Sequence, residues 1–411
     1  MSPISRRELL TYFALAPTLP RFFVQSAQAA QNVQPFERAA GYDGPIVVVV
    51  RMMGGNDGLN TVVPFRDDRY YKARPTIGIP KSDLIVMDGA DMGLNPWLGD
   101  VRRLMDEGHA AIVQGVGHAN PTRSHPRETE ILETGSLAEK APAQGWLGRY
   151  LDHACECEDE PLAGVQFADT LGRTLATASG RSKSIASPQG LLDVNADAFA
   201  KPTQRGSQPI GIEYLRQVEN DLVETGRQVR RAAQGHGGAY EYPDSVFGQS
   251  LRWTGDMIET GCPTRAYYVT IGAFDTLTTP TFDTHVYQLA KHKLLFTELG
   301  RGLRAFRDHM RKAGQLNRIL LMTFSDFGRH VEENRDGGTE HGNASLLFLM
   351  GGKVRPGLIG SPADLGRVQD GGLDPGVDFR QVYASILGDW LKIDADAILG
   401  ERIDPYRVVV A

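Results

Sequence analysis

Acidic and imidazole side chains stand beside two apolar segments late in the chain. The apolar run from Leu320 ends in SDFGR (residues 325–329), and TEHG (residues 339–342) precedes a second apolar run. Such runs predict buried strands, and open α/β sheets bind ligands beyond the carboxyl ends of their strands. Asp326 and His341 are side chain types that divalent metals bind. This stretch therefore predicts a metal site.

A similar arrangement ends the apolar segment at residues 45–53, which reads PIVVVVRMM. Its nearly continuous β-branched run predicts a strand buried on both faces, as in a parallel sheet covered by helices. The segment GGNDG (residues 54–58) follows, where glycines permit a tight turn that leaves Asp57 at the strand end. Asn-Asp-Gly is also ordinary turn chemistry, so a ligand and a turn residue are both open interpretations of Asp57.

A hydroxyl group follows the next predicted strand, at residues 110–117. Pro126 favours the first turn of a helix, which places Ser124 and His125 in its cap region. A hydroxyl there faces unpaired backbone N–H groups and the positive end of the helix, a place that stabilises anions. A serine at a helix start can equally be a simple cap. The neighbouring Arg123 and histidines favour a functional interpretation.

A third predicted strand, residues 265–275, ends in Asp275. Asp283 and His285 follow it after a short insertion, and a long helix is predicted over residues 286–313. Two carboxylates and an imidazole close together at a strand end are a more specific signal of a metal site than each alone.

Composition limits the classes of function. The chain has 411 residues, 41% of them hydrophobic, which allows one large core or two modest ones. Its formal net charge of -6 comes from interspersed charges of both signs, so a nucleic-acid partner has no electrostatic support. The cysteines Cys155, Cys157 and Cys262 form neither a disulfide framework nor a four-ligand zinc pattern, although Cys262 could bond to one of the other two in an oxidising compartment.

The N-terminus predicts export. Arg6 and Arg7 precede a moderately apolar segment at residues 10–20 and an Ala-Gln-Ala site at residues 27–29, the order found in a twin-arginine signal peptide. We expect residues 1–30 to be this signal, the twin-arginine export machinery to be a partner, and the mature protein to be periplasmic. No later apolar run approaches the roughly 20 residues that a membrane-spanning helix needs.

Five segments resemble the successive signatures of the exported bacterial family called domain of unknown function 1501. They are GGNDGLN (54–60), TRSH (122–125), FDTH (282–285), SDFGR (325–329) and TEHG (339–342). That family is similar to the alkaline phosphatase and sulfatase superfamily. The resemblance implies an α/β fold with a central mostly parallel sheet sandwiched by helices, alkaline-phosphatase-like. We expect residues 31–411 to form one such domain, with a possible helical cap around residues 146–261.

The resemblance also implies roles for particular side chains. Ser124 stands where the superfamily has its nucleophile, with His125 beside it, and Arg123 or Arg329 would hold the anionic group together with Asn56. The implied metal ligands are Asp57, Asp283, His285, Asp326 and His341, with Asp275 as the alternative to Asp283. The chain departs from the formylglycine sulfatases, because neither its Ser124 segment nor its Cys262 segment has their signature spacing.

Two functions are therefore expected. The first is a periplasmic metal-dependent hydrolase that uses zinc, magnesium, manganese or calcium to cleave a phosphate- or sulfate-type ester, either a small anionic ester or a cell-envelope substrate. The alternative is a non-catalytic exported protein that keeps the fold and binds a ligand or partner in the crevice at the strand ends.

Overall fold

The computed structural model describes residues 42–87, 91–154, 162–186, 188, 221, 223–272 and 280–410. The chain divides into two compact units, Met1–Ala40 with Ser187–Arg231, and Gly41–Ala186 with Ala232–Ala411. Every element discussed below belongs to the second unit. The predicted signal peptide, Cys155, Cys157 and Asp275 lie outside the described residues.

A central sheet forms the body of this unit. Among the described residues it has nine strands, in the order β11-β5-β10-β9-β1-β8-β6-β7, with β14 also beside β5. Only β10 runs antiparallel to its neighbours β5 and β9, and every other described pair is parallel. The strands are β1 (Ile46–Met52), β5 (Ala110–Gly117), β6 (Gly164–Gln166), β7 (Ser182–Ser184), β8 (Ala266–Ile271), β9 (Ile319–Ser325), β10 (Ser345–Gly351), β11 (Gly357–Ile359) and β14 (Val377–Asp378). The predicted mostly parallel sheet is confirmed.

Strand β1 lies inside the sheet, as its β-branched sequence predicts. It pairs in parallel with β8 on one side and β9 on the other, so that Val49 stands opposite both Tyr268 and Met322. The side chains from Val47 to Val50 are 0% exposed, because helices cover both faces of the strand. The chain leaves this buried strand at Met52, directly before the predicted Asp57 turn.

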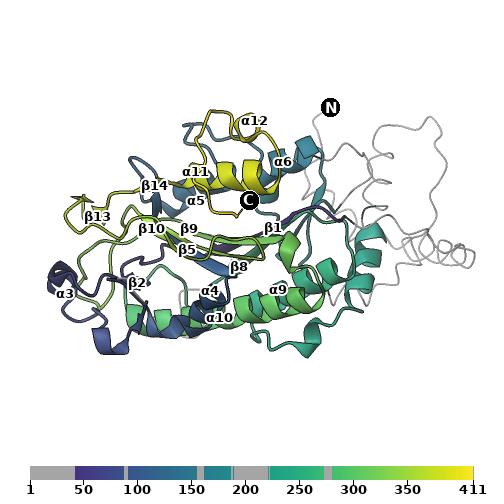
Figure 1. Cartoon of the computed structure of the whole chain (residues 1–411). Coiled ribbons are helices and arrows are strands. Elements are labelled where there is room, and N and C mark those ends of the chain that lie inside the picture. The colour runs from purple at the N-terminus through teal and green to yellow at the C-terminus, as the bar shows by residue number, and fades with distance from the viewer. Residues whose placement is uncertain are drawn as a thin grey trace, which may run out of the picture. The chain divides into compact units, whose positions relative to one another are not determined.

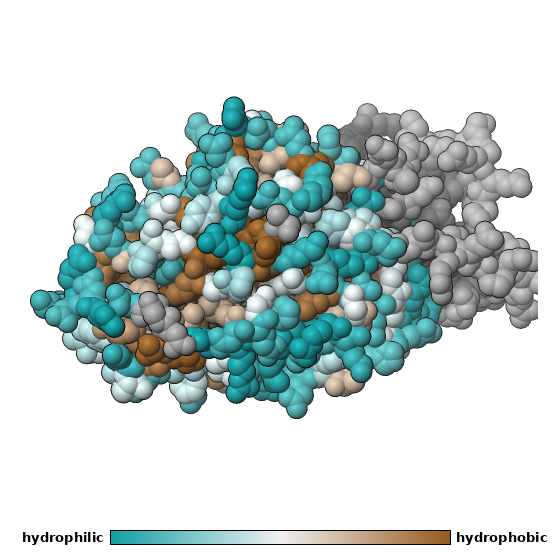
Figure 2. Space-filling model, viewed as in Figure 1, coloured by the Kyte–Doolittle hydropathy of each residue, from teal (hydrophilic) through white to brown (hydrophobic). Residues whose placement is uncertain are grey.

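Helices cover the two faces of the sheet (Figure 1). One layer contains α5 (His125–Thr134), α6 (Trp146–Ala154), α11 (Phe379–Ser385) and α12 (Ala395–Leu399), and the other contains α4 (Gly99–Asp106), α9 (Val246–Glu259) and α10 (Gln288–Lys312). Apolar side chains fill the space between the first layer and the sheet, and Trp146 stacks on Tyr383 with ring centres 4.4 Å apart. On the face shown in Figure 2, hydrophilic residues cover most of the surface and apolar residues gather at the level of the sheet. The predicted α/β sandwich is confirmed.

Smaller elements surround the sheet. The strands β2 (Val62–Val63), β3 (Ile85–Val86) and β4 (Gly93–Leu94) form a separate sheet, and β12 (Val368–Gln369) pairs with β13 (Gly372–Leu373). Near the C-terminus, α11 continues as a π-helical turn, η8 (Ile386–Trp390). Within residues 146–261, where a helical cap was expected, α6, β6, β7 and α9 are parts of the sheet and its helical layers.

Glycine allows the strand ends to meet. Gly54, directly after β1, has φ +96°, and a Cβ atom there would collide with the backbone of Asp283. A Cβ atom at the adjacent Gly55 would collide with the ring of Phe327. Backbone hydrogen bonds close the same contacts, from Phe282 N to Met53 O (2.7 Å) and from Asp326 N to Gly54 O (2.9 Å). The turn after β1 therefore packs against the segments around Asp283 and Phe327, which are distant from it in the sequence.

We expect Gly54→Ala to destabilise the protein more than Gly108→Ala. Both glycines have positive φ, but a Cβ atom at Gly108 would meet open space. The backbone strain costs about 1–2 kcal/mol at either position, and overpacking at Gly54 adds about 1–3 kcal/mol. Urea unfolding of both variants measures the difference, and equal losses would show that the turn has room for a side chain.

Candidate metal centre

Five of the predicted site residues lie together at the carboxyl ends of β1 and β9. They reach this place from the first residue of α5, the segment before α10, the turn after β9 and the loop before β10. Parallel strands that end at one edge of a sheet bring such segments together. The five residues are His125, Asp283, His285, Asp326 and His341, and we call them the histidine–aspartate cluster.

Asp283 is the centre of this cluster. The Nε2 atom of His125 lies 3.2 Å from its Oδ2. The Nε2 atoms of His341 and His285 lie 3.2 Å and 3.3 Å from its Oδ1. These four side chains are 24–36% exposed, so that a small molecule in solvent can reach them.

The other ring nitrogen of each histidine points at an oxygen that can only accept a hydrogen bond. Each Nδ1 of a neutral ring must then carry the proton, which leaves the Nε2 lone pair directed at Asp283. Histidines that bind metals are oriented in the same way, through a hydrogen bond from the nitrogen that does not bind the ion. The Nδ1 partners are Asp326 for His125 (2.9 Å), Glu340 for His285 (3.0 Å) and the carbonyl of Arg123 for His341 (2.9 Å).

The cluster has the donor set of a divalent metal site. Ligand atoms of His125, Asp283 and His341 lie within 4.8 Å of one another. The Nε2 atoms of His285 and His341 are 2.8 Å apart, and two lone pairs at this distance repel unless a proton or cation lies between them. Imidazole nitrogens with a carboxylate suit zinc and similar first-row dications better than calcium or magnesium. The residues therefore fit the predicted cofactor class.

Hydrogen bonds and charge keep Asp283 ionised. Burial by itself would raise the pKa of Asp283. The contacts with His125, His285 and His341, whose Nε2 atoms donate to it when the rings are protonated, and the charge of Arg329 hold this pKa far below its usual range. In turn, hydrogen bonds to Asp283 and Asp326 raise the pKa of His125 to about 9. A proton on His125 thus occupies the position that a cation would take.

Asp326 stands behind His125, where its carboxylate is 2% exposed. One of its oxygens accepts from His125, and the other accepts from Thr129 (3.0 Å) and Arg51 (3.2 Å). Asp326 therefore orients His125 and lies outside the set of atoms that meet at Asp283. Arg51 and Thr129 were not predicted, although Arg51 is the one charged residue in the apolar sequence of β1.

Asp57 forms a separate buried ion pair. The Nη1 atom of Arg74 lies 2.7 Å from Asp57 Oδ2, and both side chains are at most 1% exposed. Asp57 also accepts from the backbone N–H groups of Leu59 and Asn60 and from the amide of Gln288. Burial by itself would raise the pKa of Asp57, but Arg74 lowers it below its usual value. These four hydrogen bonds use the acceptor capacity of the carboxylate. Asp57 is therefore held by its own partners and lies outside the histidine–aspartate cluster.

Arg329 and Asn56, both predicted to bind substrate, lie inside the protein. Arg329 is 2% exposed and donates to the carbonyls of Gly55, Thr339 and Phe282 and to the Asp283 carboxylate. Asn56 is 0% exposed and donates to the Thr61 hydroxyl. Arg329 thus fastens the segments around the cluster and compensates the charge of Asp283.

Ser124 and Arg123 lie at the rim of the cluster. Ser124 is the N-cap residue of α5, yet its exposed hydroxyl makes no capping hydrogen bond to the described helix. The backbone of Arg123 has φ +58°, and its carbonyl accepts from His341. The Arg123 guanidinium donates to Asn343 (2.9 Å) and to the carbonyl of Asp370 (3.0 Å). A hydroxyl that makes no capping hydrogen bond within the described part of the chain therefore lies next to His125.

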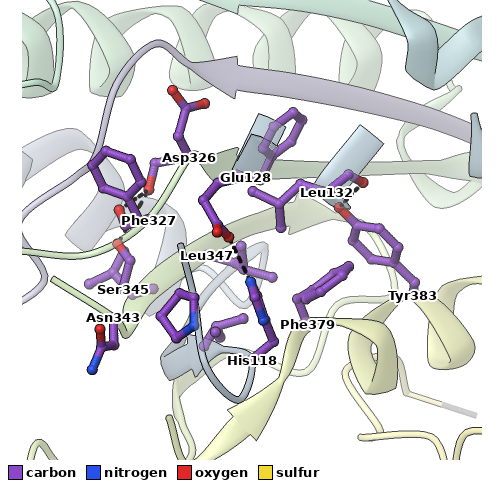
Figure 3. Close-up of a pocket in the computed structure, with 16 residues that line it drawn as sticks. His118, Glu128, Leu132, Asp326, Phe327, Asn343, Ser345, Leu347, Phe379 and Tyr383 are labelled. Atoms are coloured by element: carbon purple, nitrogen blue, oxygen red, sulfur yellow. Dashed lines mark hydrogen bonds and ion pairs between the residues drawn. The ribbon is translucent and has the colours of Figure 1, made fainter. Parts of the chain in front are cut away.

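A small cavity is lined by residues that include Asp326, His118 and Glu128 (Figure 3). Its volume of about 20 Å³ fits roughly one water molecule. His118 and Glu128 form a 2.6 Å hydrogen bond on its wall, and Glu128 also accepts from the backbone N–H (2.6 Å) and hydroxyl (2.7 Å) of Thr122. This buried pair holds the loop that leads to Ser124.

Comparison with known proteins supports the family predicted from the sequence. Residues 217–401 match the family described as "Protein of unknown function (DUF1501)". The predicted family is confirmed over this region. The DUF1501 match contains Asp283, His285, Asp326, Arg329 and His341, whereas the Ser124 segment precedes it. No curated protein matches the chain.

Similar solved structures include enzymes of ester hydrolysis. A phosphonate monoester hydrolase from Silicibacter pomeroyi is 10% identical, with a TM-score of 0.38, over 89% of this chain and 78% of that chain. The PsFucS1 sulfatase from Pseudoalteromonas sp. is 11% identical, with a TM-score of 0.36, over 94% and 72%. A protein in the alkaline phosphatase superfamily from Vibrio parahaemolyticus is 9% identical, with a TM-score of 0.33, over 84% and 72%. With TM-scores this low, the similarity assigns no role to any residue of this chain.

Within the described residues, every helix is too short or too polar to cross a membrane. This agrees with the absence of a long apolar run in the sequence.

We expect Arg74→Met to destabilise the protein by about 3–5 kcal/mol, because it leaves the buried Asp57 charge without its cation. Metal binding should be unchanged. Arg69→Met is the matched control. Arg69 lies in α3 (Asp68–Ala73), the helix that Arg74 caps, and its pair with Asp67 is exposed, so that the pair contributes little to stability. Urea unfolding and metal analysis give both readouts. Equal stability of the Arg74→Met and Arg69→Met variants would contradict a structural role of the Asp57–Arg74 pair.

We expect Asp326→Asn to weaken metal binding by about 10–100-fold, as loss of a carboxylate that orients a histidine ligand does. Asp283→Asn should abolish binding at the same site, because it removes the central oxygen donor. Metal titration by calorimetry compares the two variants. Equal loss in both would make Asp326 a direct ligand.

Proposed function

We propose that this DUF1501 protein is an exported metal-dependent hydrolase of a phosphate- or sulfate-type ester. The observation that carries the proposal is the convergence of three histidine Nε2 atoms on the Asp283 carboxylate, each ring held through its Nδ1. This convergence lies beside the exposed hydroxyl of Ser124 at the start of a helix. A purely structural cluster has no need of a free hydroxyl and partly exposed imidazoles.

The cluster is suited to hold one divalent metal. His125, Asp283 and His341 would bind it, with His285 beside them. When bound, the metal would withdraw charge from the ester oxygens and acidify a water molecule. Arg329 keeps Asp283 in place from the inside, and Asp326 fixes the ring of His125.

Ser124 is the proposed nucleophile, with a water molecule as the alternative. The Oγ atom of Ser124 would form a bond to the phosphorus or sulfur atom. At the same time the bond to the leaving alcohol would break, and the alcohol oxygen would take up a proton. Water would then cleave the serine ester and restore the hydroxyl. The positive end of α5 favours the negative charge that develops on the ester oxygens.

The anionic part of the substrate would lie at the rim formed by Ser124 and Arg123. The Arg123 side chain is 24% exposed, whereas that of Arg329 is 0% exposed. Arg123 is therefore the better candidate for direct contact with the ester, since a guanidinium can donate two hydrogen bonds to such an anion. Export rests on the twin-arginine pattern around Arg6 and Arg7.

We expect the purified protein to contain a divalent metal and to hydrolyse an aryl phosphate or an aryl sulfate. His341→Ala should lose both the metal and the activity. Ser124→Ala should keep the metal and lose at least roughly 1000-fold in kcat/KM, as removal of a nucleophile does. His153→Ala, at an exposed position of α6, is the control that should change neither.

Metal analysis of the purified variants, with assays in added zinc, magnesium, manganese and calcium, measures these effects. A protein that neither contains nor takes up metal, and turns over neither ester with any added ion, would contradict the proposal. It would favour the non-catalytic binding protein.

A further inference from the structure

A second group of potential metal ligands lies between α9 and α10, the neighbouring helices on one face of the sheet (Figure 1). Asp256 and Glu259 are three residues apart on α9, which places them on one side of this helix. His309 reaches them from α10. Ligand atoms of the three lie within 4.8 Å of one another.

The protein holds His309 in one orientation. Its side chain is 0% exposed, with Nε2 3.0 Å from Glu259 and Nδ1 3.0 Å from the hydroxyl of Tyr242. The ring of Tyr240 stacks on it with centres 4.6 Å apart. An imidazole fixed by a hydrogen bond at one nitrogen and directed at a carboxylate with the other has the arrangement of a metal ligand.

A second imidazole stands at the solvent side of the group. His236 lies before the turn η6 (Gly237–Ala239), and its Nδ1 is 2.8 Å from Glu259 Oε1. Its side chain is 76% exposed, so that an ion can reach the carboxylates past it. Cβ atoms at Gly235 and Gly237 would collide with the Asp256 carboxylate, so only glycine lets this loop close over the group.

Among the described residues, the two oxygens of Asp256 have different partners. Its side chain is 2% exposed, and Oδ1 accepts from the backbone N–H of Gly237 at 2.7 Å. Oδ2 has only the guanidinium of Arg252, at 3.6 Å, which is beyond hydrogen-bond distance for the described residues. This oxygen faces a cation without a direct hydrogen bond to it, so that its acceptor capacity is open to a metal ion.

We infer that Asp256, Glu259 and His309 form a second divalent-metal site, with His236 as a further ligand from the loop. Two carboxylates and two imidazoles suit a first-row transition-metal dication such as zinc or manganese. This metal would join α9, α10 and the loop before η6, away from the residues proposed for hydrolysis. The site therefore does not depend on the proposed hydrolase function.

Cobalt(II) titration of the full chain tests this site. The experiment uses Asp283→Asn protein, in which the first cluster lacks its central ligand. We expect one equivalent of cobalt(II) to bind, with visible d–d absorption, and to raise the unfolding temperature, because an ion that binds only the folded state stabilises it. Calorimetry measures the stoichiometry and affinity.

Glu259→Gln and His236→Ala, each added to Asp283→Asn, should weaken cobalt(II) binding at least tenfold. Glu241→Gln is the matched control, because Glu241 is a neighbouring glutamate with an 80% exposed side chain. His236 is also exposed, so His236→Ala tests the site even if Glu259→Gln does not fold. In otherwise wild-type protein, both variants should keep any ester hydrolysis.

Absence of cobalt(II) binding in Asp283→Asn protein would overturn the inference. Unchanged affinity in both the Glu259→Gln and the His236→Ala variants would do so as well. Failure of the proposed hydrolase function would appear differently, as wild-type protein that lacks ester turnover while the second site still binds cobalt(II).

Discussion

The ion pair between Asp283 and Arg329 is the interaction on which the rest of the candidate site depends. The guanidinium is buried and donates to the carbonyls of Gly55, Phe282 and Thr339 as well as to the carboxylate. One side chain thus joins the turn after β1, the segment before α10 and the loop before β10. Because a buried charge must be paired, the position of Asp283 is fixed before any ligand binds.

An arginine pairs with each of three carboxylates near the strand ends. Asp57 is paired with Arg74, Asp283 with Arg329 and Asp326 with Arg51. The pairs differ in what else reaches the carboxylate. Backbone and amide donors complete the shell of Asp57, a histidine approaches Asp326, and three histidines approach Asp283. Only the last arrangement leaves imidazole lone pairs directed at a common point near solvent. The candidate metal ligands at this edge of the sheet therefore converge on Asp283.

The two groups of proposed metal ligands have a similar arrangement although they lie on different elements. In each, a protein acceptor or hydroxyl holds one nitrogen of a histidine while the other nitrogen faces a carboxylate. The first group is built on loops at the carboxyl ends of strands, where a small substrate has access. The second is built mainly on two packed helices and holds its ligands more deeply, which suits an ion with a structural role.

The sequence by itself determined the main strands and helices, and it placed the candidate site residues directly after the strands. Continuous apolar runs such as the one in β1 can only be buried, and glycine turns with Asp or His directly after them mark strand ends. Local patterns therefore predicted the α/β sandwich and the grouping of His125, Asp283, His285 and His341. They also predicted Ser124 as the N-cap residue of α5.

Only the tertiary structure decided which charge each carboxylate meets. Arg74 is 17 residues from Asp57, Arg329 is 46 residues from Asp283, and Arg51 is 275 residues from Asp326. No local pattern encodes such pairs, because they depend on which strands become neighbours in the sheet. For the same reason the sequence could not show that Arg329 and Asn56 would be buried, or that Asp326 would orient His125 from behind.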